Sequence, residues 1–145
     1  MTTWGYVRLD PGYAANLVGY VNELKDNTIA PVDEANIRFE FSRNDRAKLH
    51  NRHAFNRLLK DEAKTGDVIV VVKLSHLSME LGWIAELVTR IGKHKLDFVA
   101  LNANVDTRLD ADKYLFTGMK TVAKLLTIKG IKGNEGGDGG GNGGC

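Results

Sequence analysis

Residues 66–78 read Gly-Asp-Val-Ile-Val-Val-Val-Lys-Leu-Ser-His-Leu-Ser, and they are the strongest guide to the architecture of this chain. The continuous apolar run over 67–74 is typical of a central strand that is covered on both faces of a sheet. It stops at polar residues, where the next helical pattern begins. Residues 4–10, Trp-Gly-Tyr-Val-Arg-Leu-Asp, have the same form. In open α/β sheets, binding and catalytic sites are built at the carboxyl ends of such strands.

Strands and helices alternate along the rest of the chain. Strands are predicted at 3–9, 36–41 and 97–101, and the polar, basic stretch 42–52 is predicted to be a loop. Four apolar stripes at helical spacing predict four helices. Their residues are Ala14, Leu17, Val18, Val21 and Leu24; Phe55, Leu58, Leu59 and Ala63; Trp83, Ile84, Leu87, Val88 and Ile91; and Leu115, Met119, Val122 and Leu126, in a last helix that starts near Asp110.

This order predicts a three-layer α/β fold. We expect a mostly parallel sheet of about four or five strands with helices on both faces. One domain is predicted over residues 1–130, followed by a disordered glycine-rich tail over 131–145, which has too few apolar side chains to offset the entropy of ordering. An unrelated domain with a flavodoxin-like arrangement is the alternative.

Composition narrows the classes of function. The 145 residues are 43% hydrophobic and 26% charged, as in ordinary globular proteins, and a net charge of +2 is too small to indicate nucleic acid by itself. The single cysteine, Cys145, allows no internal disulfide. Neither a membrane span nor a signal peptide is apparent, so we expect a cytoplasmic protein, either cellular or made from a mobile element in a host. No cofactor is expected, and His50 and His53 lack the neighbours that a metal site needs.

Four segments together resemble one known family. They are residues 5–9 (Gly-Tyr-Val-Arg-Leu), 52–59, 66–74 and 105–107 (Val-Asp-Thr). In order and spacing they resemble the catalytic domain of the serine recombinases, the resolvase and invertase family, over roughly residues 3–128. The resemblance implies a resolvase-like fold. It also implies a reaction in which a serine hydroxyl attacks a DNA phosphodiester, while several guanidinium groups stabilise the phosphate charge.

The resemblance can be followed residue by residue. Four positions of the family site are kept, namely Tyr6, Arg8, Arg52 and Lys73. Others differ: Asp10 stands where the family has its nucleophilic serine, Ser75 replaces an aspartate, His76 and Met79 replace arginines, and Leu126 and Thr127 align with a glutamate and an arginine. We therefore interpret Tyr6, Arg8, Asp10, Arg52, Lys73, Ser75 and His76 as a vestigial site with no intact catalytic set.

An aspartate is a poor substitute for the attacking serine. Its carboxylate repels the phosphate, and an acyl phosphate formed by attack would hydrolyse and leave the DNA broken. Losing one well-placed donor typically costs about 10²–10³ in rate. By the resemblance, at least two arginines of the family site are replaced in this chain, at His76 and Met79.

Local structure offers simpler roles for the same residues. Asp10 before Pro11 has the pattern of a helix N-cap followed by proline at the first helical position. Arg8 either pairs with Asp10 or binds phosphate. His76 is interpreted as an ordinary loop histidine. Ser75 and Ser78 are interpreted as turn and cap residues, with Ser78 as the N-cap of the third helix.

Two surfaces are candidates for binding. A weak, sequence-independent contact with DNA phosphates is predicted for Arg43, Arg46, Lys48, Arg52 and Arg57. The alternative is a solvated loop. Oligomerisation is predicted for the stripe of Leu115, Met119, Val122 and Leu126, since the corresponding family helix dimerises. That stripe equally fits burial against the protein's own sheet.

Two functional hypotheses follow. The first is a degenerate recombinase-like protein without strand transfer, which acts through self-assembly or by binding a protein or DNA partner. Such a protein is regulatory, for example in a hetero-oligomer with a related recombinase, or structural. The second is an active recombinase or nuclease-type phosphoryl-transfer enzyme with a rearranged site. Nucleotide binding is disfavoured because no glycine-rich phosphate loop follows the first strand.

Overall fold

The sheet forms the middle layer of the molecule. The computed structural model describes residues 1–42, 52–78, 80–109, 114–116 and 118–119. The sheet contains β1 (Thr3–Leu9), β2 (Ile37–Phe41), β3 (Val68–Val71), β4 (Asp97–Ala100) and β5 (Val105–Asp106), in the order β2-β1-β3-β4-β5. The first four strands are parallel, and β5 pairs antiparallel with β4. The predicted α/β class and mostly parallel sheet are confirmed, and the antiparallel β5 departs from an all-parallel flavodoxin-like order.

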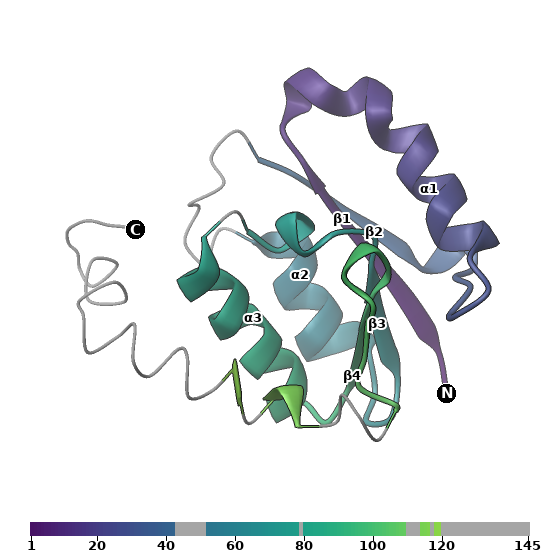
Figure 1. Cartoon of the computed structure of the whole chain (residues 1–145). Helices are drawn as coiled ribbons and strands as arrows, with labels where there is room; N and C mark the ends of the chain where they lie inside the picture. Colours follow the sequence, from purple (N-terminus) through teal and green to yellow (C-terminus); the bar gives the residue numbers. More distant parts are fainter. Residues whose placement is uncertain (43–51, 79, 110–113, 117, 120–145) are drawn as a thin grey trace, which may run out of the picture.

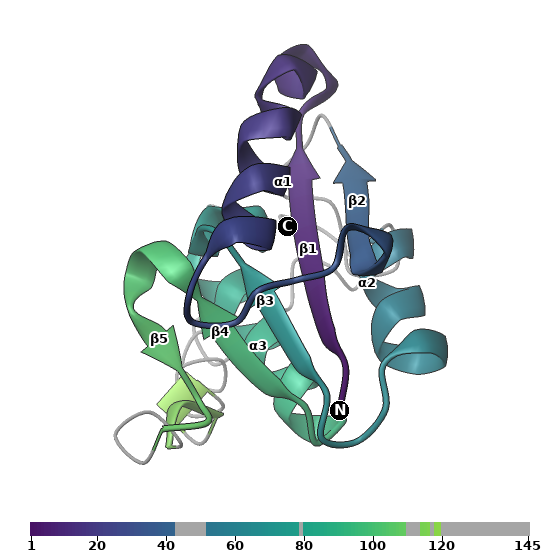
Figure 2. The same cartoon turned by 90° about the vertical axis from the view of Figure 1, so that its right-hand side faces the viewer.

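Helices cover both faces of this sheet (Figures 1 and 2). The 3₁₀ segment η1 (Pro11–Asn16) leads into α1 (Leu17–Asp26) on one face. On the other face lie α2 (His53–Arg57), which continues as the π-helical turn η4 (Leu58–Glu62), and α3 (Leu81–Lys93). Short 3₁₀ turns occur as η2 (Glu34–Asn36), η5 (Leu74–His76) and η6 (Leu101–Ala103). In the described part of the chain, no helix is long and apolar enough to cross a membrane.

The β3 strand is buried on both faces, as its sequence predicts. Ile69 and Val71 face α2 and α3 and belong to one apolar cluster, whereas Val68 and Val70 belong to a second cluster beneath α1. Its length was overestimated, because the chain leaves the sheet after Val71 and enters η5.

The beginning of the first helix differs from the prediction. Residues 11–16 form a 3₁₀ segment with a kink at Tyr13, so the α-helical repeat begins only at Leu17. Leu24 is fully buried against the sheet, but Val18 is 68% exposed. Including Val18 in the buried stripe was therefore wrong, because the change of helix type shifts which side chains face the sheet.

The first residues of the chain are fastened to the start of β3. The Asp67 carboxylate accepts hydrogen bonds from the Thr2 amide at 2.8 Å, from the Trp4 indole at 3.0 Å and from the Lys64 amide at 2.9 Å. Thr3 pairs with Val68 in the adjacent strand. Asp67 thus joins the beginning of the chain to its middle.

Gly92 allows the segment after β5 to approach α3 closely. A Cβ atom at Gly92 would lie 2.8 Å from the Cγ and Cδ1 atoms of Phe116. We expect Gly92→Ala to lower the free energy of unfolding by roughly 1–3 kcal/mol, because the Phe116 ring must move. Gly19→Ala is the matched control, since Gly19 lies in α1 and, apart from the backbone of its own helix, nothing lies within 4 Å of its Cβ position. Alanine there should stabilise by up to about 1 kcal/mol. Urea denaturation of both variants measures the difference, and equal effects would contradict the predicted clash.

Candidate functional site

A pocket of about 280 Å³ lies where β1 and β3 end. Its lining comprises Arg8, Leu9, Asp10, Tyr13, Asn16, Tyr20, Ser75 and His76. The two strands are neighbours although α1, β2 and α2 separate them in sequence. This is the switch point of a 2-1-3-4 strand order, where open α/β sheets build their sites. The structure thus brings together four of the predicted site residues: Arg8, Asp10, Ser75 and His76.

Asp10 occupies the turn after β1. Its Oδ1 atom accepts a hydrogen bond of 2.8 Å from the Gly12 amide, and Pro11 begins η1. The predicted N-cap role is therefore confirmed, although the helix that Asp10 caps is a 3₁₀ segment. Because one carboxylate oxygen holds the turn, the side chain is fixed by local structure.

Arg8 is a buried cation at the other side of the pocket. Its guanidinium donates to the carbonyl oxygens of Ser42 and Ser75, both at 3.5 Å. These two carbonyls follow the ends of β2 and β3, so Arg8 spans the carboxyl edge of three neighbouring strands.

His76 forms part of the pocket wall and is buried. The sequence interpretation of His76 as an ordinary loop histidine was therefore wrong. His76 closes η5 and is only 3% exposed, and its Nδ1 has no hydrogen-bond partner in the described part of the chain. Its ring meets the Tyr20 ring edge to face, with 4.6 Å between centroids. Burial lowers the pKa of His76 to about 4, and the nearby charges of Lys73 and Arg8 act in the same direction. The imidazole is therefore neutral at pH 7.

Lys73 is directed toward Tyr20. Its Nζ atom donates a 3.1 Å hydrogen bond to the Tyr20 hydroxyl and lies 5.3 Å from the centre of that ring. Tyr20, on α1, therefore contacts both Lys73 and His76, which lie after β3. Tyr20 was not predicted as a site residue. Its spacing in the sequence indicates a position on a helix, but not which residues of other segments this position faces.

The pH dependence of folding should report the state of His76. Its pKa in an unfolded chain is about 6.5. Between pH 6.5 and 4 the unfolded state binds a proton that the folded state does not, so stability falls as the pH falls. The full effect is about 3 kcal/mol. His76→Gln should remove this component when denaturation of both proteins is measured at pH 7 and pH 4.5. In an NMR titration, a His76 ring that titrates near pH 6.5 would refute the prediction.

Tyr6 and Arg52 belong to a second polar group, which is centred on Glu40. The Glu40 carboxylate accepts hydrogen bonds from the Tyr6 hydroxyl at 2.9 Å and from the Ala54 and Phe55 amides at 3.0 Å. The Arg52 guanidinium hydrogen-bonds to Tyr6. Burial raises the pKa of Tyr6 far above its ordinary value, and the charge of Arg52 opposes this rise. The group holds the start of α2 on the sheet.

This arrangement corrects the sequence interpretation of Arg52. The side chain is 1% exposed, so it does not fit the predicted surface contact with DNA phosphates. It is not among the residues that line the pocket. The structure thus divides the residues of the predicted site into three groups. Arg8, Asp10, Ser75 and His76 line the pocket, Lys73 contacts Tyr20, and Tyr6 and Arg52 belong to a buried group around Glu40.

Glu40 was also missed, although a signal for it was present. Residues 36–41 alternate polar and apolar, which indicates a strand with two unlike faces but not which face is inward. In the structure α2 covers the polar face, so Glu40 is buried at 7% exposure while Phe41 is 51% exposed.

Comparisons with known proteins show which family has this fold. The family model described as "Resolvase, N terminal domain" matches residues 26–129, more than half of the chain. The chain belongs to the resolvase family.

Two solved structures share the fold of this resolvase-family chain. The N-terminal catalytic domain of TP901-1 integrase is 25% identical, covers 90% of this chain and 100% of its own, and gives a TM-score of 0.59. A resolvase-family site-specific recombinase from Streptococcus pneumoniae is 14% identical, covers 89% of each chain and gives a TM-score of 0.62, a likeness of fold alone. Among curated proteins, none matches the sequence.

Several residues of the predicted DNA contact, oligomerisation stripe, family site and tail lie outside the described part of this resolvase-family chain. Arg43, Arg46, Lys48, Met79, Val122, Leu126, Thr127 and the tail 131–145 lie outside them, whereas Arg57 is an exposed residue in the last turn of α2. Ser78 accepts a 3.1 Å hydrogen bond from the Glu80 amide, but Glu80 is the N-cap residue of α3. Predicting Ser78 as that cap was wrong by two residues.

Leu115 and Met119, from the predicted oligomerisation stripe, lie half-buried. Both pack against the core cluster on the α2 and α3 side of the sheet. For this stripe, the alternative to oligomerisation was burial against the protein's own sheet. The packing of Leu115 and Met119 agrees with that alternative. Among the described residues, no group of three or more His, Cys, Asp or Glu side chains is placed to hold a metal ion.

Proposed function

We propose that this resolvase-family protein does not carry out DNA strand transfer and acts through self-assembly or by binding a protein or DNA partner. The observation that carries the proposal is Asp10. It stands where the family has its nucleophilic serine, and its carboxylate is held by the Gly12 amide. A carboxylate at this place repels the phosphate that a nucleophile must approach.

The charge of the pocket supports the same conclusion. Arg8 is positive, Asp10 is negative and His76 is neutral at pH 7, so these lining groups sum to about zero. Stabilising a phosphoryl transition state requires an excess of fixed positive charge. Lys73 adds a positive charge beside the pocket, but it is not among the lining residues and its amino group donates to the Tyr20 hydroxyl.

A rearranged phosphoryl-transfer enzyme is the alternative. It would use Asp10 or Ser75 with His76 as an acid–base partner. A general base works best when its pKa is near the working pH, and the pKa of His76 is about 4. His76 is therefore a weak base at neutral pH, which disfavours this alternative.

A plasmid assay separates the two functions. Purified protein is incubated with supercoiled DNA, with and without Mg²⁺, and the products are run on native and denaturing gels. We expect unchanged plasmid and no covalent protein–DNA adduct. Nicking or an adduct that Asp10→Ala abolishes, while Asp33→Ala at an exposed position retains it, would reject the proposal.

Light scattering at several protein concentrations tests assembly. The half-buried packing of Leu115 and Met119 leaves less of the stripe free, so we expect a weak, concentration-dependent increase in molar mass. Mixing with a related active recombinase tests the regulatory form of the proposal, in which the two proteins form a hetero-oligomer and strand transfer falls. A molar mass that stays that of a monomer at every concentration, together with no effect on the recombinase, would exclude self-assembly and this hetero-oligomer. DNA binding would then be the remaining form of the proposal.

A further inference from the structure

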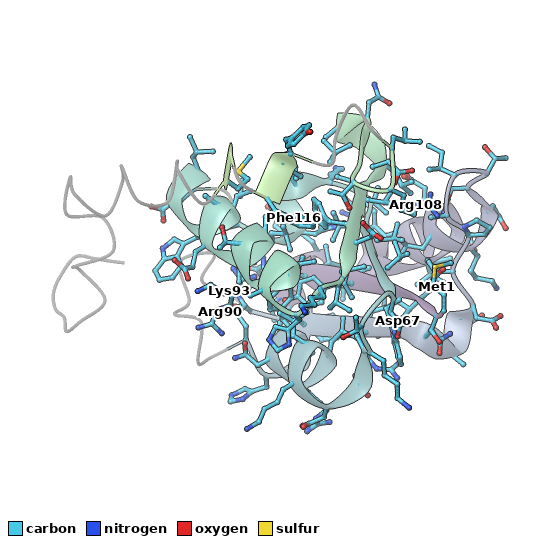
Figure 3. The ribbon with its side chains drawn as sticks, turned by 90° about the horizontal axis from the view of Figure 1, so that it is seen from below. Met1, Asp67, Arg90, Lys93, Arg108 and Phe116 are labelled. Atoms are coloured by element: carbon cyan, nitrogen blue, oxygen red, sulfur yellow. The ribbon has the colours of Figure 1, made fainter. Side chains whose placement is uncertain are left out.

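Five basic side chains gather at the end of the molecule where the parallel strands begin. We call them the basic rim: Lys60, Lys64, Arg90, Lys93 and Lys95. The four lysines are exposed and Arg90 is partly exposed. Lys60 lies in the last turn of η4, and Arg90 and Lys93 lie in the last turn of α3. Figure 3 shows Arg90 and Lys93 next to each other at the end of α3.

Two turns hold the rim together. Lys64 lies in the turn before β3, and Lys95 lies in the turn before β4. The Gly66 amide donates a 3.0 Å hydrogen bond to the Lys95 carbonyl, so the turns are in direct contact. The strands that follow them are paired, with Val68 opposite Asp97.

The rim carries a clear excess of positive charge. In the described part of the chain, none of its five cationic groups has a hydrogen-bond or ion-pair partner. Four acids among the described residues lie at the same end of the molecule. Asp61 is exposed, Glu62 is engaged by Arg38 at 3.0 Å, and the carboxylates of Asp67 and Asp97, at the starts of β3 and β4, accept hydrogen bonds, so the five rim cations still outnumber the acids. Favourable interaction with the helix dipole accounts for basic residues in the last turn of α3. It does not account for Lys64 and Lys95, which lie beyond the helices.

The backbone conformation of Lys95 is a second, independent observation that supports a function for the rim. The φ angle of Lys95 is 59°, in the left-handed region, directly after the C-cap residue of α3. Glycine is favoured at this position because it has no Cβ to clash with the backbone. The chain keeps a charged side chain where glycine would be more stable, and such strained positions point to function.

We propose that the basic rim binds the phosphate backbone of duplex DNA without sequence preference. Lysine is depleted at protein–protein interfaces, whereas clustered lysines and arginines are the usual contacts to phosphates. The rim lies at the amino ends of the strands, and the pocket lies at their carboxyl ends. The proposal is therefore independent of whether the pocket cleaves DNA. It also differs from the predicted contact through residues 43–57.

Fluorescence anisotropy with a short labelled duplex of random sequence, over a range of salt concentrations, tests this contact. The logarithm of the binding constant should fall linearly with the logarithm of salt concentration. Lys64→Gln combined with Lys95→Gln should reduce the slope by roughly two units, and Lys95→Gly by roughly one. Lys95→Gly should also raise the melting temperature, because glycine relieves the strained backbone.

Lys25→Gln is the matched control. It removes the same charge from the α1 layer, where Lys25 is paired with Glu34 at 2.9 Å, and it should leave binding unchanged. Equal weakening by Lys25→Gln would indicate an effect of net charge and overturn the proposal. So would rim variants that fold, as judged by urea denaturation, and bind DNA like wild type. If these variants reduce self-association while DNA binding is unchanged, the rim is a contact between copies and the proposal fails.

Discussion

Glu40→Ala is expected to lower the free energy of unfolding by about 3–5 kcal/mol, the loss typical of removing one partner from a buried charged group. The carboxylate accepts hydrogen bonds from Tyr6, Ala54 and Phe55. Its removal leaves the Tyr6 hydroxyl proton and two helix-start amides without an acceptor, and it leaves the guanidinium of Arg52 buried near them. Chemical denaturation followed by circular dichroism measures the loss.

Glu62→Ala provides the matched control for Glu40→Ala. Glu62 pairs with Arg38 at 3.0 Å on the same face of β2, but both side chains are partly exposed. A pair of this kind contributes about 0–1 kcal/mol, because water competes for both partners. Similar losses in the two variants would show that Glu40 does not hold α2 in place.

Asp10→Ser is expected not to restore DNA cleavage, although it returns the hydroxyl that the family uses. By the resemblance to the family, at least two arginines of its site, at the positions of His76 and Met79, would still be missing. At about 10²–10³ in rate for each lost donor, two independent losses amount to roughly 10⁴–10⁶. We therefore expect no covalent protein–DNA adduct on a denaturing gel.

The result with Asp10→Ser separates two explanations of the inactivity that we propose. If the nucleophile alone were missing, the variant would form an adduct with DNA that Asp10→Ala does not form. If the pocket lacks positive charge, both variants remain inactive. An adduct with Asp10→Ser would contradict the charge argument while leaving the fold assignment unaffected.

The mostly parallel sheet and its covering helices could be predicted from the sequence, because the strongest sequence patterns reflect burial. The run over 67–74 is apolar on every residue that enters the sheet, and only a strand covered on both faces explains it. Arg8, Asp10, Ser75 and His76 were predicted as one site from the resemblance to the family. The carboxyl ends of β1 and β3, which lie at one edge of the sheet, bring these four residues together around the pocket.

Other parts of the site depend on packing between distant segments. The alternation over 36–41 fits either face turned inward, and only the position of α2 selects the face that buries Glu40. Tyr20 reaches Lys73 and His76 because of where α1 crosses the sheet. The kink at Tyr13, which shifts the helical repeat, depends on how the chain leaves β1. Spacing along the chain carries none of this information.

The position of β1 in the sheet has a consequence for how the protein is made. The first strand lies between β2 and β3, and its pairing with Val68 and the bonds of Asp67 span more than sixty residues of chain. During synthesis on the ribosome, one edge of β1 stays open until the third strand has emerged. Folding should therefore wait for a slow, long-range closure. Until that closure, the nascent chain exposes an unpaired strand edge, which is a site for aggregation.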